Sequence, residues 1–325
     1  MNNDKKILIT GGAGYIGSHT VHYFVNQGID PKNIVVVDNL IYGHKSYLPK
    51  GVVFVKGDLL NKKTVAKIFK EHKIDSVIHF AAYAFVGESM ENPGKYFENN
   101  IQGGVNLLEA MVANGCKKIV FSSSCAVYGT PKTTPITEDQ PNSPINPYGE
   151  SKLMFEKILE WYWQIYKVNS VRLRYFNAAG AGFEIGESHN PETHLIPLVI
   201  SAAQKKRKSI SIFGNNYSTP DGTCIRDYVH VLDLADAHLK ALQYMNKKTG
   251  TNFFNIGTGI GTSVKEIVDK VKKYQSKFAV IKEKQRVGDP PILVADPSKA
   301  NKILKWKSKY NIDDIIKDAW NWHSR

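Results

Sequence analysis

One stretch decides the fold of this 325-residue chain, Lys6-Ile7-Leu8-Ile9-Thr10-Gly11-Gly12-Ala13-Gly14-Tyr15-Ile16-Gly17. A short apolar run that ends in closely spaced glycines predicts a buried strand, a tight turn and the start of a helix. The glycines let the backbone approach a pyrophosphate, and the helix N-terminus adds positive dipole. Asp38 ends the next apolar run, where an acid binds the adenosine ribose hydroxyls and repels a 2′-phosphate. The pattern therefore predicts a dinucleotide site that prefers NAD to NADP.

The rest of the first half alternates short β-branched runs with helical patterns, which is typical of a parallel sheet flanked by helices. We expect further strands at 34–37, 52–55, 76–79, 118–121 and 170–174. Helices are expected from Gly17 to about Asn26, over 61–70 with Asn61 as cap, over 93–113 and over 148–166. The fold class is therefore α/β, a Rossmann-type doubly wound parallel sheet, in residues 1–176. After Asn177 the alternation fails, which predicts a smaller, partly interleaved α/β domain over 177–325, with single segments returning to the first domain. The apolar spacing over 312–320 predicts a terminal helix that packs on its neighbours.

Composition limits the classes of protein that this chain can belong to. A hydrophobic content of 42% and a charged content of 22% are those of a globular domain. Three cysteines, Cys116, Cys125 and Cys224, lack zinc-like spacing and cannot all pair, so we expect a cytoplasmic protein without a metal site. The first apolar run is too short for a signal sequence, and none approaches a membrane span.

The net charge of +13 has two interpretations. It can mark a nucleic-acid surface, or it can reflect solubilising lysines that also create a positive field for an anionic ligand. The basic clusters at 205–208 and 299–309 are far apart in the sequence and have few aromatic residues between them. We therefore favour the second interpretation and expect no nucleic-acid partner.

Tyr148 and Lys152 lie four positions apart, so they share one face of the predicted helix. A phenol titrates near 10, and a tyrosine base at neutral pH needs its pKa lowered by roughly three, or about 4 kcal/mol. One cation about 4 Å away at an effective dielectric near 20 supplies an energy of that order. Two other pairs share the spacing, Tyr128/Lys132 and Tyr244/Lys248.

The serines at 122–124 distinguish these three pairs. They follow the strand at 118–121, and strand ends in an open parallel sheet face the ligand crevice, although serine is also common in plain turns. Tyr148 opens the next helix near that edge, whereas Tyr128 lies in a loop and Tyr244 in a late helix. The context therefore favours Tyr148 and Lys152 as the reactive pair.

Several motifs together resemble one family. They are the glycine loop, Ser-Ser-Ser-x-x-Val-Tyr-Gly at 122–129, Pro-Tyr-Gly-x-Ser-Lys at 147–152 and Arg-Tyr-Phe-Asn at 174–177. Further segments at 79–82, 86–89, 212–215, 221–228, 286–289 and 320–322 narrow the match. The chain resembles the nucleotide-sugar 4-epimerases of the extended short-chain dehydrogenase/reductase family along nearly its whole length.

The resemblance implies an isomerase that interconverts UDP-glucose and UDP-galactose through a transient 4-keto sugar, with NAD regenerated in each cycle. It assigns Tyr148 as the base at the sugar 4-hydroxyl, Lys152 as a ligand of the nicotinamide ribose, and Ser124 as a hydrogen-bond partner of O4. The family binds the UDP firmly and the sugar loosely, because a tightly held sugar could not turn over.

The same resemblance implies two sets of binding residues. The cofactor set is Gly11, Gly14, Tyr15, Ile16, Gly17, Asp38, Asn39, Asp58, Leu59, Phe80, Asn99, Tyr148, Lys152 and Tyr175. The substrate set is Ser124, Tyr148, Asn177, Leu195, Phe213, Arg226, Arg286, Asp289 and Leu293. The two arginines match ligands of the diphosphate, for which guanidinium forks are well suited.

Three positions depart from the family pattern. Ala84 stands where many relatives carry a lysine that contacts the cofactor. His194 stands where some relatives have an asparagine near the diphosphate. Leu293 replaces a bulky tyrosine over the sugar pocket, so we expect room for an N-acetyl group and turnover of UDP-N-acetylglucosamine and UDP-N-acetylgalactosamine.

Several other functions remain open at this point. Sugar-nucleotide dehydratases and UDP-glucuronate decarboxylases share the fold, but dehydratases place an Asp-Glu pair where this chain has Cys125-Ala126. UDP-xylose/UDP-arabinose 4-epimerases and a catalytically silent NAD-binding sensor are further alternatives, although a silent protein has no use for Ser124, Tyr148 and Lys152 together. Family members are often homodimers, which we expect here as well.

Overall fold

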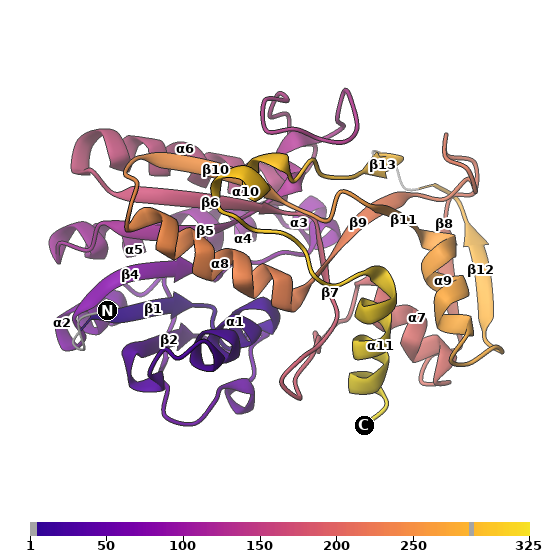
Figure 1. Ribbon diagram of the computed structural model, residues 1–325, viewed down its shortest axis with the longest axis horizontal. Helices are drawn as coiled ribbons and strands as arrows, with labels where there is room; N and C mark the ends of the chain where they lie inside the picture. The colour runs from indigo at the N-terminus through magenta and orange to yellow at the C-terminus, as the bar shows by residue number, and fades with distance from the viewer. Residues whose placement is uncertain (1–4, 286–288) are drawn as a thin grey trace.

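The computed structural model describes residues 5–285 and 289–325 (Figure 1). Its main element is a seven-stranded parallel sheet in the order β10-β6-β5-β4-β1-β2-β3. The strands are β1 (Lys6–Thr10), β2 (Ile34–Asp38), β3 (Val53–Lys56), β4 (Ile74–His79), β5 (Lys118–Ser124), β6 (Asn169–Tyr175) and β10 (Thr251–Ile256). The predicted α/β doubly wound sheet is confirmed.

Helices cover both faces of this sheet because its strands are apolar on both sides. Ile7 and Ile9 of β1 pack with α1 (Tyr15–Asn26) and α8 (Val231–Met245), in one buried cluster. Leu8, between them, points to the other face and packs with α2 (Lys62–Glu71), α5 (Gly103–Ala113) and α6 (Pro147–Tyr166). This alternation is the period-two geometry of a strand, and it fixes the register of the core.

The predicted elements of the first half agree with the structure to within a few residues. Asn61 caps α2, and its side chain accepts a hydrogen bond from the backbone N–H of Thr64. The predicted helix over 93–113 is instead α4 (Pro93–Phe97), a π-helical segment (Glu98–Gln102) and α5. A short helix that was not predicted, α3 (Val86–Glu91), precedes it. The wide π turn contains Asn99, and such turns are frequent at functional sites.

The strand order reverses direction between β1 and β4, which are neighbours in the sheet. The carboxyl ends of both strands lie beside the glycine loop, and β5 ends next to β4. Ligands of open α/β sheets bind at this position. Two segments from the second half, α8 and β10, pack on or within this sheet (Figure 1).

A smaller lobe lies beyond the carboxyl edge of the sheet (Figure 1). It contains β7 (Asn177–Ala179), β9 (Ile225–His230), β11 (Gly261–Ser263) and β13 (Ile292–Leu293), and a second pair, β8 (Ser209–Phe213) with β12 (Ala279–Glu283). Its helices α7 (Leu195–Ala203), α9 (Val264–Lys272) and α11 (Ile312–His323) share one apolar core. Ile315, Ile316 and Ala319 of α11 are buried there, so the predicted packing role of the terminal helix is confirmed. A further short helix, α10 (Ser298–Ile303), contacts β10.

Within the described residues, no helix is both long enough and apolar enough to span a membrane.

Candidate active site

The glycine loop forms a tight turn that only glycine permits. Gly11 has φ of 68°, and its N–H donates to the carbonyl of Val37 at 2.8 Å. A Cβ on Gly17 would lie 2.3 Å from the Gly11 carbonyl oxygen, so helix α1 can start close to the turn only because residue 17 has no side chain. Gly14 caps α1 without a side-chain hydrogen bond, which leaves the positive helix end directed at the crevice.

Asp38 lies at the end of β2 beside this loop. Its carboxylate accepts hydrogen bonds from the backbone N–H groups of Ala13 at 3.0 Å and Leu40 at 2.8 Å. Burial nevertheless raises the pKa of the Asp38 carboxyl. The loop, the free helix end and a carboxylate held in place by backbone donors fit the pyrophosphate and ribose of NAD.

Other members of the predicted cofactor set line the carboxyl edge of the sheet. The Asn39 amide donates to Asp58 at 3.0 Å, just beyond β2 and β3, and Leu59 is buried next to Asp58. Asn99 donates to Asn100 at 2.9 Å, and Asn100 donates to Ser151 of α6 at 3.0 Å.

Phe80 and Tyr175 meet at His238 of α8, a residue that sequence reasoning missed. The ring centres of Phe80 and His238 are 4.6 Å apart, and the Tyr175 hydroxyl is hydrogen-bonded to His238. Burial lowers the pKa of His238 to about 4, so its imidazole is neutral at physiological pH. No motif marked this histidine, because its role depends on α8 folding back against the sheet.

Tyr148 and Ser124 come together where helix α6 begins. Asn146 caps α6, its side chain accepting from the Gly149 N–H at 2.8 Å, and Pro147 occupies the first turn. A Cβ on Gly149 would lie 2.6 Å from the Ala126 carbonyl oxygen, so glycine allows α6 to start directly against the turn that follows β5. This close approach brings Tyr148 to the serine-tipped end of β5.

Burial has the largest effect on the pKa of Tyr148, the predicted base. It raises the pKa of Tyr148 to about 12, and the neighbouring Ser124 hydroxyl acts in the opposite direction. Ser124 also accepts from the Ala126 N–H at 3.1 Å, which fixes its hydroxyl oxygen. Cys125, beside them, has its thiol pKa raised to about 12 by burial and is therefore neutral.

Lys152 lies one turn further along α6 and is buried. Its ammonium donates to the backbone carbonyl of Ser122 at 2.8 Å. Burial lowers the pKa of Lys152 to about 7, against the opposing effect of Glu156. Its nitrogen is 4.9 Å from the centre of the Phe121 ring. Lys152 is thus desolvated on the same helix, α6, that carries Tyr148.

A buried ion pair that sequence reasoning missed holds helix α6 against the sheet below these residues. Glu156, one turn beyond Lys152, accepts from the Arg174 guanidinium at 3.0 and 2.6 Å and from the Ser123 hydroxyl at 2.5 Å. Both charged side chains are 2% exposed, so the pair links helix α6 to the ends of β5 and β6 in a low-dielectric setting. Glu156 follows the Tyr148/Lys152 face at helical spacing, which was the available signal.

The sequence of the second lobe carries the two arginines that were predicted to bind the diphosphate. Arg226 of β9 lies in register with Leu293 of β13, and its guanidinium is 2.5 Å from the Asp289 carboxylate. The charge of Arg226 also acts to lower the pKa of the Cys125 thiol, although burial outweighs it. Arg286, the second predicted diphosphate ligand, lies outside the described residues.

The remaining substrate residues are spread along the second lobe. Asn177 begins β7, Leu195 begins α7, and Phe213 ends β8 with 38% of its surface exposed. Next to Phe213 is a cavity of about 420 Å³. It is lined by Gly214, Asn215, Asn216 and residues 282–285.

Of the three positions that depart from the family pattern, Ala84 is exposed, and His194 is held by Glu187 and Glu192 rather than being free.

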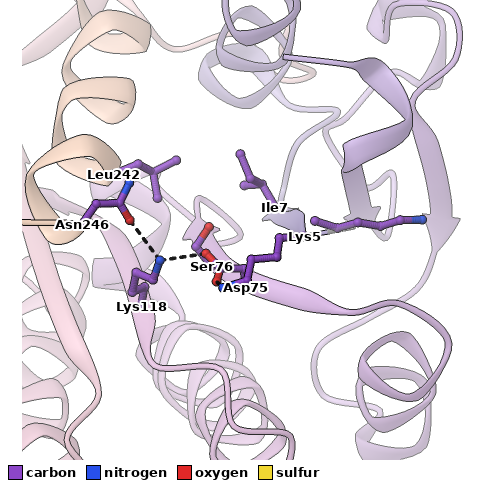
Figure 2. Close-up of a pocket in the computed structure, with 8 residues that line it drawn as sticks. Lys5, Ile7, Asp75, Ser76, Lys118, Leu242 and Asn246 are labelled. Carbon is purple, nitrogen blue, oxygen red and sulfur yellow. Dashed lines mark hydrogen bonds and ion pairs between the residues drawn. The ribbon is translucent and has the colours of Figure 1, made fainter. Parts of the chain in front are cut away.

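A second cavity, of about 250 Å³, lies at the amino ends of β1, β4 and β5 (Figure 2). Lys118 donates there to Asp75 at 2.8 Å and to Asn246 at 3.0 Å. This edge is opposite to Ser124, and ligands of open parallel sheets bind at the carboxyl edge. The predicted reactive residues Ser124 and Tyr148 lie at that carboxyl edge and not beside this cavity.

Comparison with known proteins identifies relatives over nearly the whole chain. Residues 7–257 match the model of the NAD dependent epimerase/dehydratase family. The UDP-glucose 4-epimerase of Streptococcus mutans is 48% identical over 98% of this chain and 96% of its own length. The UDP-glucose 4-epimerase of Brucella ovis, solved in complex with NAD, superposes with a TM-score of 0.93 at 43% identity, covering 98% of each chain. The UDP-Glc/GlcNAc 4-epimerase of Campylobacter jejuni gives a TM-score of 0.86 at 41% identity, covering 98% of this chain and 99% of that one.

Proposed function

This chain belongs to the NAD dependent epimerase/dehydratase family and is an enzyme that uses NAD to epimerise UDP-glucose at C4, and we propose that Ser124, Tyr148 and Lys152 carry the reaction. The observation that supports this assignment best is the close approach of the start of α6, which carries Tyr148, to the turn that follows Ser124 at the carboxyl edge of the sheet, where a Cβ on Gly149 would lie 2.6 Å from the Ala126 carbonyl oxygen. The family match favours UDP-hexoses over the pentose and silent-sensor alternatives.

The residues divide the work by position. Tyr148, as phenolate, takes the proton from the sugar O4, and Ser124 holds that oxygen through its hydroxyl. NAD, held by the glycine loop and Asp38, would supply the hydride acceptor for C4 and the hydride donor for the opposite face of the 4-keto sugar. Lys152 orients the nicotinamide ribose, and Tyr148 then returns its proton to O4. The neutral Cys125-Ala126 pair leaves no acid or base for an elimination.

The sugar can turn over in the site because the enzyme binds the UDP moiety tightly and the sugar loosely. Arg226 and Arg286 hold the diphosphate, Asn177 and Leu195 border it, and Phe213 with Asp289 holds the uridine. Residues 1–176 then bind NAD and carry the catalytic groups. Residues 177–325, apart from α8 and β10, bind the UDP-sugar.

Leu293 supports turnover of the N-acetylated pair as well. It is half-buried on β13, opposite Arg226, where its side chain is smaller than the tyrosine expected in hexose-restricted relatives. The Campylobacter jejuni relative carries both sugars in its name. Leu293→Tyr should lower kcat/KM for UDP-N-acetylglucosamine while leaving UDP-glucose turnover unchanged, and equal losses on both would contradict this role.

A homodimer in the cytoplasm is the setting that we propose. Helix α6 exposes Trp161 at 61% and Ile165 at 63% of their surface, an apolar strip that a second copy of the chain would cover. Trp161→Glu should convert a dimer to a monomer in sedimentation velocity, and an unchanged sedimentation coefficient would contradict this interface.

The function is tested by incubating purified protein with UDP-galactose and following UDP-glucose, with NAD released from denatured protein measured in parallel. Tyr148→Phe should reduce kcat by roughly 10²–10⁴-fold and keep the bound NAD. The exposed Tyr166→Phe, at the end of the same helix, is the matched control. Undiminished turnover by Tyr148→Phe would refute the assignment.

A further inference from the structure

A compact group of two carboxylates and two imidazoles lies outside the catalytic residues. Glu187, His189, Glu192 and His194 belong to the segment between β7 and α7, and their potential ligand atoms all lie within 4.8 Å of one another. His194 is the last residue before α7. The cysteine spacing predicted no metal site, whereas this Glu-x-His-x-x-Glu-x-His pattern contains no cysteine and lies in a loop.

The distances between these atoms suit a small divalent cation. His194 Nδ1 lies 2.9 Å from an oxygen of Glu187 and 2.9 Å from an oxygen of Glu192. His189 Nδ1 lies 3.3 Å from Glu187 and 3.7 Å from Glu192. In a tetrahedron with metal–ligand bonds of about 2.0 Å, neighbouring ligand atoms are about 3.3 Å apart. The four nitrogen–oxygen distances, from 2.9 to 3.7 Å, are close to that value.

A second observation concerns the orientation of one imidazole. His189 Nδ1 is buried and makes no hydrogen bond of normal geometry to any residue that the structure describes, although two carboxylates lie near it. The nitrogen points into the group without the directed contact that a hydrogen bond requires. Glu187 is buried as well, with 5% of its side chain exposed, so its charge needs a close positive partner.

Aromatic side chains surround this group of residues, which distinguishes it from an acidic patch on a solvated surface. Phe85 packs against both imidazoles, with ring centres 5.7 Å from His189 and 6.1 Å from His194. Tyr15 of the glycine loop meets His189 edge-on at 6.3 Å. A cation held here would tie the segment before α7 to the loop that approaches the cofactor.

We propose that Glu187, His189, Glu192 and His194 form a binding site for a divalent transition metal of the zinc class. Two imidazole nitrogens and two carboxylate oxygens are a donor set that zinc accepts in tetrahedral geometry. Protons are the competing ligands, because two imidazolium ions would also neutralise the two carboxylates. The metal would therefore bind as neutral imidazoles replace imidazolium ions.

Binding is tested on the full chain, first stripped with chelator, by equilibrium dialysis against Zn²⁺ and by the visible absorption of Co²⁺. We expect one Zn²⁺ per chain and the intense Co²⁺ bands of tetrahedral coordination. His189→Ala/His194→Ala should weaken Zn²⁺ binding by roughly 100-fold or more, since losing a hydrogen-bond partner of a ligand alone costs about 10–100-fold. His72→Ala, at the end of α2, is the control and should bind as the wild type does.

Two results would overturn the proposal. One is wild-type protein that takes up no stoichiometric Zn²⁺ and leaves the Co²⁺ spectrum that of the aqueous ion. The other is metal binding that the double variant retains. The wild-type measurement stands even where the double variant does not fold, and neither readout depends on epimerase activity.

Discussion

The Lys152 ammonium lies 5.8 Å from the centre of the Tyr148 ring and donates instead to the backbone carbonyl of Ser122. Sequence reasoning expected a cation about 4 Å from the phenol, near enough to lower its pKa by roughly three. In the structure burial dominates both groups, raising the pKa of Tyr148 to about 12 and lowering that of Lys152 to about 7. Burial therefore outweighs the lysine at Tyr148, and we expect the positive nicotinamide ring of bound NAD to lower the pKa of the tyrosine.

Tyr148 should titrate differently with and without cofactor. In protein stripped of NAD we expect the phenol to ionise near pH 12, and in the NAD complex well below 10. NMR of protein with ¹³C-labelled tyrosine measures both, with Tyr148→Phe identifying the resonance. A pKa below 10 in the stripped protein would show that Lys152 suffices.

Lys152 should make stability rise with pH between about 7 and the ordinary lysine value of 10.5. In that window the unfolded chain binds a proton at this lysine that the native state has lost, so the free energy of unfolding increases with pH. Below pH 7 both states are protonated and the cost of burying the charge is fully present. Urea unfolding at pH 6 and pH 9 should therefore show a smaller rise for Lys152→Met than for wild type. Equal rises for the two proteins would count against a depressed lysine pKa.

Arg226 should act in substrate binding rather than in chemistry. Arg226→Gln removes a charged hydrogen-bond donor worth about 1.5–3 kcal/mol, so KM for UDP-galactose should rise by roughly 10–150-fold with little change in kcat. Arg207→Gln, an exposed arginine beyond α7, is the control for charge alone. A loss confined to kcat would contradict the anchoring role.

The Glu156–Arg174 pair should support stability under the active site. Glu156→Gln leaves a buried guanidinium without its counter-ion, so we expect a loss of about 3–5 kcal/mol in the free energy of unfolding. Glu156→Gln/Arg174→Met removes both charges and should recover much of that loss. If the double variant unfolds more easily than the single one, the charges are not coupled as the 2.6 Å contact indicates.

Local patterns predicted the cofactor half of the molecule well. The alternation of apolar runs with helical patterns predicted β1 and α1. Glycine is required at positions 11 and 17 because a Cβ there would lie less than 3 Å from other atoms. The π turn at Asn99 was not predictable, because it is a bulge within a continuous helical pattern. The return of β10 to the first sheet and the contact of His238 with Tyr175 depend on packing between distant segments, which no local period encodes.

The central claim is that the C4 hydrogen leaves and returns within one closed site, while Tyr148 moves only the O4 proton. The most direct measurement supplies UDP-galactose with deuterium at C4 and determines the isotope content of the UDP-glucose formed in ordinary water. We expect full retention of deuterium at C4, a primary isotope effect on the rate and no net change in NAD. Loss of the deuterium to solvent would contradict the account.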